Sequence, residues 1–217
     1  MQTDTAHLYW NREWQGGGDA KWTTPEPMVT DHARGFAPGA RVLDLGAGLG
    51  RHALALARMG FAVEALDASP AALDAIGGAA RIGGQAVGLH AGMMTALPFP
   101  DLSFDHVISW NVIYHGDEEV VRATIAEVAR VLKPGGTFLF TMLSARRLPV
   151  EQARARGREL SPGTWVFDGD GDKVHPHYFC DARTLLVLMP GFEPLFLQDL
   201  PHDTPGSWHW HVIAERT

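Results

Sequence analysis

The feature that most constrains this chain is a glycine-rich turn between two apolar segments, Val42-Leu43-Asp44-Leu45-Gly46-Ala47-Gly48-Leu49-Gly50-Arg51. The apolar run 41–45 predicts a short buried strand, and the Ala- and Leu-rich run 51–59 predicts a helix. Glycine lets a ligand approach the main chain closely, and the first N–H groups of a helix lack intrahelical partners. The stretch therefore predicts a site where a nucleotide-like ligand meets the start of a helix.

Short apolar segments alternate with helical patterns along much of the chain. Further strands are predicted at 61–66, 86–90, 104–109 and 137–143, and helices at 71–80 and 117–133. Such alternation is typical of an α/β fold, in which helices cover both faces of a parallel sheet. Two closing strands, 192–197 and 208–214, are joined by a short connection containing Pro205-Gly206, which favours an antiparallel pair. The glycine-rich stretch 77–84 is predicted to be a loose connection.

Two segments flank this pattern. Residues 1–40 carry an aromatic segment that includes Tyr9, Trp14 and Trp22, and a helix predicted from Thr24-Pro25 to about Arg34. The aromatic segment is a helix packed on the domain or a lid over a ligand. Residues 144–177 lack clear periodicity, which is typical of a functional or mobile segment and makes them a candidate substrate cap. We expect residues 1–217 to form a single domain.

Composition excludes several classes of protein. The chain has 217 residues and a formal net charge of −7, and no Lys/Arg-rich cluster, which disfavours binding to a phosphate backbone. Its most basic stretch, 146–158, is predicted to be a solvated helix face. A lone cysteine, Cys180, excludes a disulfide framework. Without a signal peptide or a membrane-spanning apolar run, we expect a soluble cytoplasmic protein, as a monomer or homodimer.

An acidic residue, Asp67, follows the second predicted strand and lies 21 residues after Gly46. In an open α/β sheet this position faces the crevice at the carboxyl ends of the strands, where a carboxylate can accept hydrogen bonds from ribose hydroxyls. A strand-end Asp that starts a turn is the alternative. A dinucleotide fingerprint requires its third glycine at position 51, which is Arg51 here. The pattern therefore favours a nucleoside other than a nicotinamide dinucleotide.

Four motifs in order resemble the class I S-adenosylmethionine-dependent methyltransferases. They are Asp44-Leu45-Gly46-Ala47-Gly48-Leu49-Gly50, Leu66-Asp67-Ala68-Ser69-Pro70, Leu97-Pro98-Phe99 with Ser103-Phe104-Asp105, and Leu132-Lys133-Pro134-Gly135-Gly136. The sequence is most similar to the small-molecule branch that includes methyltransferase type 11, ubiquinone-biosynthesis-like and tellurite-resistance-like enzymes. The resemblance implies a Rossmann-like, seven-stranded, mostly parallel sheet with its last strand antiparallel. It also implies S-adenosyl-L-methionine as donor and S-adenosyl-L-homocysteine as product.

The resemblance also implies which residues hold the cofactor. Asp67 would bind the ribose and Ala68 would pack on the adenine, while Asp44 would support the turn or bind the amino group. Met93 stands where the family often has an Asp bonded to the adenine amino group, so the adenine edge would be read by backbone at Met94 or by water. The methionine part would be met by main chain at Gly46, Ala47, Gly48 and Asn111.

The candidate catalytic residue is His115, on the loop after the fourth strand, with Tyr114 as second choice. A neutral histidine can accept a proton from a phenol or alcohol, whereas a thiolate needs no base. A loop histidine that caps the next helix is the alternative. Candidate substrate contacts are Tyr9, Trp14, Trp22, His115 and His177.

Two histidine pairs, His175/His177 and His209/His211, invite a metal interpretation. No carboxylate or cysteine stands at ligand spacing, so no metal is predicted. His209 and His211 are expected to face solvent from one strand, and His175 and His177 to border the substrate pocket.

We expect methyl transfer to a small-molecule O, N or S nucleophile, whose identity the sequence does not indicate. An RNA or tRNA methyltransferase is an alternative, disfavoured by net charge and by the lack of an Asn-Pro-Pro-aromatic motif. A cofactor-binding sensor or partner subunit without catalysis is another. A nicotinamide oxidoreductase is disfavoured by Arg51.

Overall fold

The computed structural model describes residues 2–202 and 204–217. Its strands are β1 (Arg41–Leu45), β2 (Ala62–Asp67), β3 (Val87–Ala91), β4 (Phe104–Ser109), β5 (Leu132–Ser144), β6 (Gly157–Ser161), β7 (Thr164–Phe167), β8 (His177–Cys180), β9 (Phe192–Pro201) and β10 (Trp208–Arg216). Its α-helices are α1 (Ala6–Gln15), α2 (Pro27–Ala33), α3 (Arg51–Arg58), α4 (Pro70–Gly83), α5 (Glu118–Val131), α6 (Leu148–Arg154) and α7 (Ala182–Val187). Short 3-10 turns are η1 (Ala20–Trp22), η2 (Ala145–Arg147) and η3 (Asp172–Val174).

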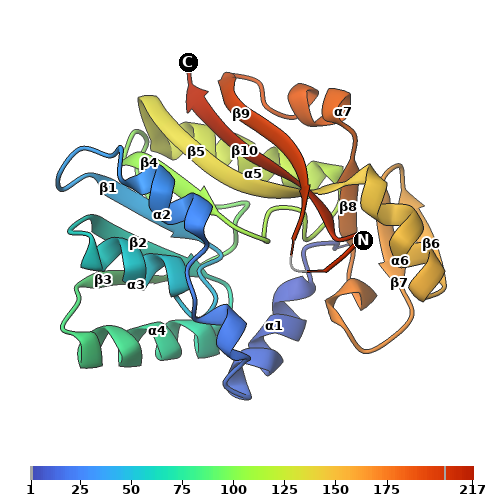
Figure 1. Cartoon of the computed structure of the whole chain (residues 1–217), viewed down its shortest axis with the longest axis horizontal. Coiled ribbons are helices and arrows are strands. Elements are labelled where there is room, and N and C mark those ends of the chain that lie inside the picture. Colours follow the sequence, from blue (N-terminus) through green and yellow to red (C-terminus); the bar gives the residue numbers. More distant parts are fainter. Residues whose placement is uncertain (1, 203) are drawn as a thin grey trace.

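Seven strands form the predicted sheet, in the order β3-β2-β1-β4-β5-β10-β9. The strands from β3 to β5 pair in parallel, and β10 pairs antiparallel with both β5 and β9 (Figure 1). The α/β fold with an antiparallel last strand is therefore confirmed. The chain order of strands reverses beside β1, which places the turn after β1 at the crevice where ligands of such sheets bind.

Three further strands extend the sheet beyond the prediction. β8 pairs in parallel with the last two residues of β5, β7 pairs antiparallel with β8, and β6 closes a hairpin with β7. Residues 144–177, predicted to be irregular, therefore contain η2, α6, the β6–β7 hairpin and η3. The hairpin strands are only four and five residues long, so their alternation is too short to give a periodic signal.

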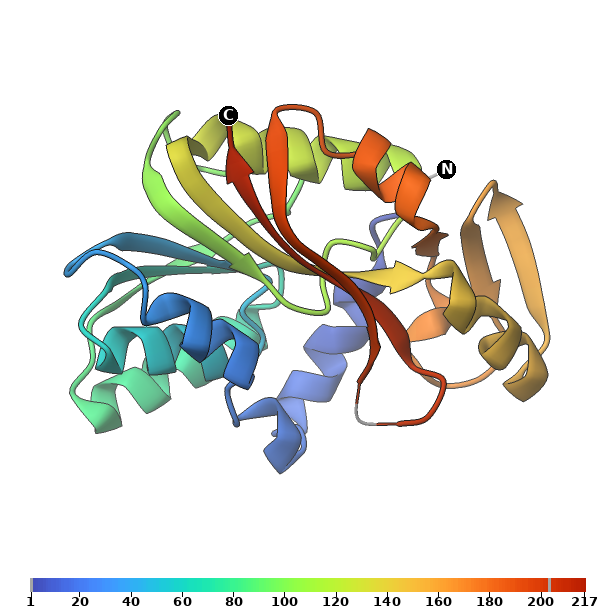
Figure 2. The same cartoon turned by 45° about the horizontal axis from the view of Figure 1, so that its top comes forward.

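Two apolar clusters lie on opposite faces of the sheet. One includes Val121 and Val128 of α5 and Leu185 of α7. The other includes Val29 of α2 and Ile76 of α4, together with α3 residues. Figure 2 shows α5 and α7 above the sheet and α2, α3 and α4 below it. The central strands are thus covered on both sides, which explains their almost continuous apolar sequence.

Two predicted helix boundaries were wrong. α2 begins at Pro27 after Glu26, not at Thr24-Pro25. α4 continues through the glycine-rich stretch and ends at Gly83, where a loose connection was predicted. A Cβ at Gly77 would lie 3.2 Å from Leu89 Cδ1, so glycine there lets α4 pack closely on β3 despite its low helix propensity.

Among residues 2–202 and 204–217, no helix has both the length and the apolar character that crossing a membrane requires.

Candidate active site

The glycine turn is held by backbone hydrogen bonds to the end of β2. The N–H groups of Gly46 and Ala47 donate to the Leu66 carbonyl at 2.8 and 3.1 Å, and Gly48 N–H donates to Asp67 Oδ2 at 2.8 Å. Gly46 has φ +72°, and a Cβ there would lie 2.4 Å from Val112 Cγ2. Only glycine fits this position without strain, so the turn requires glycine at position 46.

Asp44 lies under the turn instead of in the cavity. Its side chain is 1% exposed, and Oδ2 accepts a hydrogen bond from Ala53 N–H at 2.9 Å. Burial raises the pKa of Asp44 to about 7, against the opposing effect of that bond. Asp44 thus ties β1 to α3 and supports the turn, the first of its two predicted roles.

Asp67 is fixed by main chain on both sides. Besides Gly48, the N–H of Ser69 donates to its Oδ1 at 2.8 Å. Burial raises the pKa of Asp67, and the backbone N–H donors oppose this shift. The carboxylate lies on the wall of the cavity with acceptor capacity left, since each oxygen has two lone pairs.

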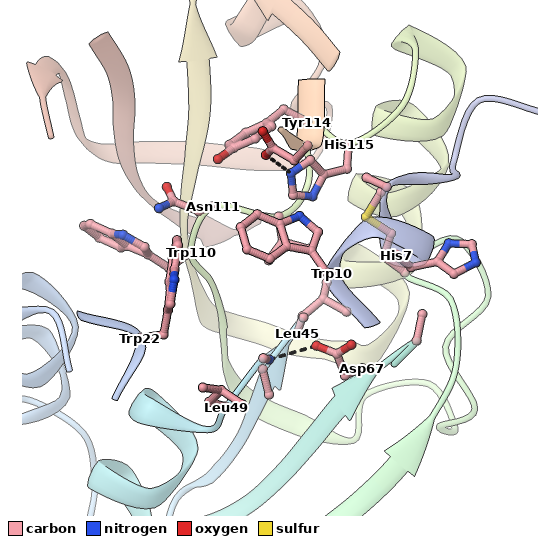
Figure 3. Close-up of a pocket in the computed structure, with 18 of the residues that line it drawn as sticks. His7, Trp10, Trp22, Leu45, Leu49, Asp67, Trp110, Asn111, Tyr114 and His115 are labelled. Atoms are coloured by element: carbon pink, nitrogen blue, oxygen red, sulfur yellow. Dashed lines mark hydrogen bonds and ion pairs between the residues drawn. The ribbon is translucent and has the colours of Figure 1, made fainter. Parts of the chain in front are cut away.

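The cavity at the carboxyl ends of the strands encloses about 420 Å³, a size typical of small-molecule sites. Figure 3 shows Asp67, Trp10, Trp110, Asn111, Tyr114 and His115 around it. Nearly all predicted cofactor residues line it; these are Gly46, Ala47, Gly48, Asp67, Ala68, Met93, Met94 and Asn111. Asp44 is the exception.

Asn111 adopts a left-handed backbone conformation, with φ +63°. Its N–H donates to Thr141 Oγ1 at 2.8 Å, and the Thr141 hydroxyl donates to Asn111 Oδ1 at 3.2 Å. Thr141 on β5 therefore holds a strained residue at the cavity. Non-glycine residues in this conformation are uncommon and occur often at functional sites.

Indole rings from the N-terminal segment cover the cavity. Trp10 and Trp14 stack with centroids 5.0 Å apart, and Trp22 packs edge-on against both rings at 5.3 and 5.8 Å. All three line the cavity, whereas Tyr9, a predicted substrate contact, does not. Sequence reasoning did not assign Trp10 to the site. Its spacing of four from Trp14, which places both rings on one face of α1, was the available signal.

The loop after β4 brings Tyr114 and His115 to the cavity as predicted. Burial lowers the pKa of His115 to about 4 and raises that of Tyr114. The imidazole is therefore neutral and the phenol keeps its proton near neutral pH. His177 lies behind His115, with ring centroids 4.8 Å apart, and is buried beyond the cavity wall instead of forming part of it.

Asp172 of η3 was missed by sequence reasoning. Its Oδ2 lies 3.3 Å from His177 Nε2 and 3.7 Å from His115 Nε2. Burial alone would raise the pKa of Asp172, but His177, His115 and Lys173 hold it well below its usual value. The expectation that no carboxylate accompanies His175/His177 was wrong, because Asp172 precedes His177 by only five residues.

The expectation that His209 and His211 face solvent was also wrong. They are 3% and 5% exposed, since His202 stacks on His209 at 3.7 Å and the Trp110 ring lies parallel to His211 at 5.1 Å. Arg147, predicted to lie on a solvated face, lines the cavity and contacts His209 Nε2 at 3.1 Å. The stretch 146–158 is therefore not simply a solvated helix face.

Sequence comparisons show that part of the chain is similar to known methyltransferases. Residues 42–136 match the family model described as a methyltransferase domain. A demethylmenaquinone methyltransferase of Clavibacter sepedonicus is 36% identical over 146 residues, covering 66% of this chain and 55% of that protein. An uncharacterized methyltransferase of Synechocystis is 38% identical over 103 residues, covering 48% and 47%. The chain spans about half the length of the curated relatives it matches.

Solved structures agree in fold. A 1,6-didemethyltoxoflavin-N1-methyltransferase of Burkholderia thailandensis superposes with a TM-score of 0.75 at 19% identity, covering 98% of this chain and 88% of that chain. A magnesium protoporphyrin IX methyltransferase of Synechocystis gives 0.68 at 17% identity, covering 97% and 84%. Residues 42–136 are therefore similar to the methyltransferase domain family, and the chain shares its fold with these solved methyltransferases.

Proposed function

We propose that this chain binds S-adenosyl-L-methionine in the cavity and transfers its methyl group to a small-molecule O, N or S nucleophile. The observation that carries this proposal is the pairing of the glycine turn with Asp67, whose carboxylate accepts the Gly48 N–H and lies on the cavity wall. The matched methyltransferase domain covers both features. The activity that we propose for the whole protein is inferred from the glycine turn and Asp67.

Different residues of the cavity wall suit the two halves of the cofactor. Asp67 and Ala68 would hold the ribose and adenine, with Met93 and Met94 beside the adenine edge. Gly46, Ala47, Gly48 and Asn111 would meet the methionine part through main chain. Tyr114 and His115 would then lie toward the methyl acceptor, together with the indoles of Trp10, Trp14 and Trp22.

Methyl transfer places few demands on the protein beyond alignment and exclusion of water, because the sulfonium already activates the carbon. An acceptor lone pair forms the new bond to the methyl carbon, the carbon–sulfur pair returns to sulfur, and S-adenosyl-L-homocysteine leaves. An alcohol or phenol acceptor also loses a proton, which neutral His115 is placed to take up. Tyr114 would donate a hydrogen bond to the acceptor.

The flanking segments would bind the acceptor as parts of a single domain. Residues 1–40 would act as a lid, because the indoles of α1 and η1 line the cavity. Residues 144–177 would act as a substrate cap, because they supply Arg147, Asp172 and Lys173 to the same wall. Thr5 Oγ1 and His175 Nδ1 are 2.9 Å apart, so the two segments are in contact with each other.

A small-molecule acceptor is supported by net charge and by relatives. The chain has a net charge of −7, which disfavours nucleic acid, the principal alternative substrate. Similar proteins are described as methyltransferases of didemethyltoxoflavin, magnesium protoporphyrin IX and demethylmenaquinone. The indoles of Trp10, Trp14 and Trp22 on the cavity wall would suit an acceptor with a flat aromatic ring.

The test combines calorimetry with a product-release assay. We expect both S-adenosylmethionine and S-adenosylhomocysteine to bind with one site per chain, and NAD not to bind. Release of S-adenosylhomocysteine is then screened over phenols, thiols, amines and carboxylates. Binding without turnover of any acceptor would favour a sensor or partner subunit. Failure of both cofactor forms to bind would overturn the proposal.

A further inference from the structure

Three metal-ligating side chains converge at the acceptor end of the cavity. Within the described part of the chain, His115, Asp172 and His177 have ligand atoms that all lie within 4.8 Å of one another. They come from the loop after β4, from η3 and from β8, three segments that only the fold brings together. Two imidazoles and one carboxylate form a ligand set used by zinc and by non-haem iron.

The hydrogen bonds around His177 aim its Nε2 at the carboxylate. His177 Nδ1 lies 2.9 Å from the His175 carbonyl, which has no proton to give, so Nδ1 must be the donor. Nε2 lies 3.3 Å from Asp172 Oδ2, where it donates a proton to the carboxylate when the ring is charged and offers a lone pair to a metal ion when the ring is neutral. Metal-bound histidines commonly donate their other N–H to a backbone carbonyl in this way.

His115 brings a second ring nitrogen to the same point. Its Nε2 is buried and has no hydrogen-bond partner, and it lies 3.7 Å from Asp172 Oδ2. A buried polar atom without a partner is costly. Ligand atoms of a tetrahedral metal with bonds of about 2.1 Å are about 3.4 Å apart, so the two separations from Oδ2 suit one shared ion.

Neighbouring charges leave Asp172 Oδ2 available to a cation. Lys173 Nζ approaches the other oxygen, Oδ1, at 3.6 Å and also lies 3.7 Å from Glu151 Oε1. Arg147 pairs with Glu151 at 2.6 Å. Glu151 thus partly neutralises both Arg147 and Lys173. None of these contacts directs either basic group at Asp172 Oδ2.

We propose that His115, Asp172 and His177 bind one divalent transition-metal ion, with Zn²⁺ as the reference ion. His115 and Asp172 line the cavity and His177 lies behind them, so the remaining coordination position faces the acceptor. Binding of the ion does not depend on methyl transfer. The role of the ion does rest on the proposed function. In that role the ion holds the acceptor heteroatom, favours loss of the acceptor's proton to solvent, and replaces His115 as the means of deprotonation.

Calorimetry on the full-length, chelator-treated protein tests the site directly. We expect one equivalent of Zn²⁺ to bind with micromolar or tighter affinity, and Mg²⁺ not to bind, because Mg²⁺ prefers oxygen ligands. Co²⁺ should give the intense visible bands of a four-coordinate site. The variants His177→Gln and Asp172→Asn should each weaken Zn²⁺ binding by about a hundredfold.

Matched controls are His90→Gln and Asp101→Asn, which lie outside the cavity wall and should leave Zn²⁺ affinity unchanged. A third variant, His211→Gln, tests the separate contact between His202 and His211. Absence of stoichiometric Zn²⁺ binding would overturn the proposal. So would binding that survives His177→Gln, or that only His211→Gln removes.

Binding of S-adenosylhomocysteine keeps the two proposals distinguishable. Zn²⁺ binding without cofactor binding would support the metal site and contradict the proposed methyl transfer. Cofactor binding without Zn²⁺ binding would support the proposed cofactor site and contradict the metal site. The titration of the wild type tests the metal site without any substitution, so a variant that fails to fold does not decide the result. Circular dichroism identifies such a variant.

Discussion

The two ends of the cavity are built in different ways. The end proposed to bind the cofactor is built mainly on one stretch, 41–69, in which main-chain N–H groups of the glycine turn meet Leu66 and Asp67. Met93, Met94 and Asn111 complete its wall. The end proposed to bind the acceptor is assembled from side chains of distant segments, including Trp10, His115, Arg147 and Asp172. The turn restricts the residue type at Gly46, where a Cβ would lie 2.4 Å from Val112 Cγ2, whereas an assembly of side chains can be altered one residue at a time.

This difference separates what each end controls. Substitutions at the cofactor end should change cofactor affinity or the stability of the turn. Substitutions at the acceptor end should change turnover while cofactor affinity stays constant. Variants that break this separation would show that the two ends are coupled.

The largest effect is expected from Asp67→Ala. The change removes the acceptor of the Gly48 and Ser69 N–H groups and the proposed ribose ligand. Hydrogen bonds to a charged group contribute about 1.5–3 kcal/mol each, so loss of two bonds to the ribose hydroxyls should lower the affinity for S-adenosylhomocysteine at least about a hundredfold. Isothermal titration calorimetry measures it. Asp74→Ala, at an exposed position of α4, is the control. Unchanged affinity in the Asp67 variant would contradict the proposal that Asp67 binds the ribose of the cofactor.

Asp44→Asn should alter stability instead of binding geometry. The pKa of Asp44 is about 7 in the folded chain, against an ordinary value of 3.8, so between these values the folded chain binds a proton that the unfolded chain has lost. The contribution of Asp44 to the free energy of unfolding is therefore fully present below pH 3.8. It is lost as the pH rises from 3.8 through about 7. Between about pH 5 and pH 8 the wild type should lose about 3 kcal/mol that the variant retains.

Urea unfolding at about pH 5 and pH 8 checks this expectation. The amide introduced by Asp44→Asn keeps an oxygen for the Ala53 N–H and cannot ionise. Other titrating groups cancel when the two proteins are compared at the same pH values. Parallel pH dependence in wild type and variant would show that Asp44 is not the buried acid inferred here.

The sequence predicted that the glycine turn and Asp67 lie together at the cavity, and it did so for a physical reason. A strand, a glycine turn and an acid at the next strand end are local patterns, and parallel pairing of β1 with β2 brings them together automatically. Even so, the residues that pack under the turn were not predicted, such as Val112 against Gly46. That contact depends on how a distant loop folds over the strand ends.

The acceptor end was predicted less well. His115 and Tyr114 were found because a loop after a strand faces the crevice. Asp172 was missed because nothing in a short aperiodic segment indicates that η3 returns to His115. His209 and His211 alternate as a surface strand would, yet the segment carrying His202 covers them. Tertiary packing decided these positions, and local patterns do not record it.

At the acceptor end, Tyr114→Phe should lower kcat about tenfold, the equivalent of one lost hydrogen bond of about 1.4 kcal/mol. Burial raises the pKa of Tyr114, so its phenol keeps the proton that it would donate to the acceptor. Cofactor affinity should not change. The matched control is Tyr178→Phe, whose hydroxyl donates to Glu118 at 2.8 Å outside the cavity wall. Equal losses in both variants would contradict a role for Tyr114 at the acceptor.

The smallest effect is expected where the cofactor end departs from the pattern that the chain resembles. Met93 lines the cavity, and the resemblance implies an Asp at its position. Met93→Asp should supply an acceptor to the adenine amino group and tighten cofactor binding by about 1 kcal/mol, or about fivefold. Met93→Leu, which fills similar space without an acceptor, should leave affinity unchanged. If calorimetry gives equal or weaker binding for Met93→Asp, the adenine edge is already satisfied by main chain near Met94. The cofactor end would then depend on backbone contacts even more completely than its glycine turn indicates.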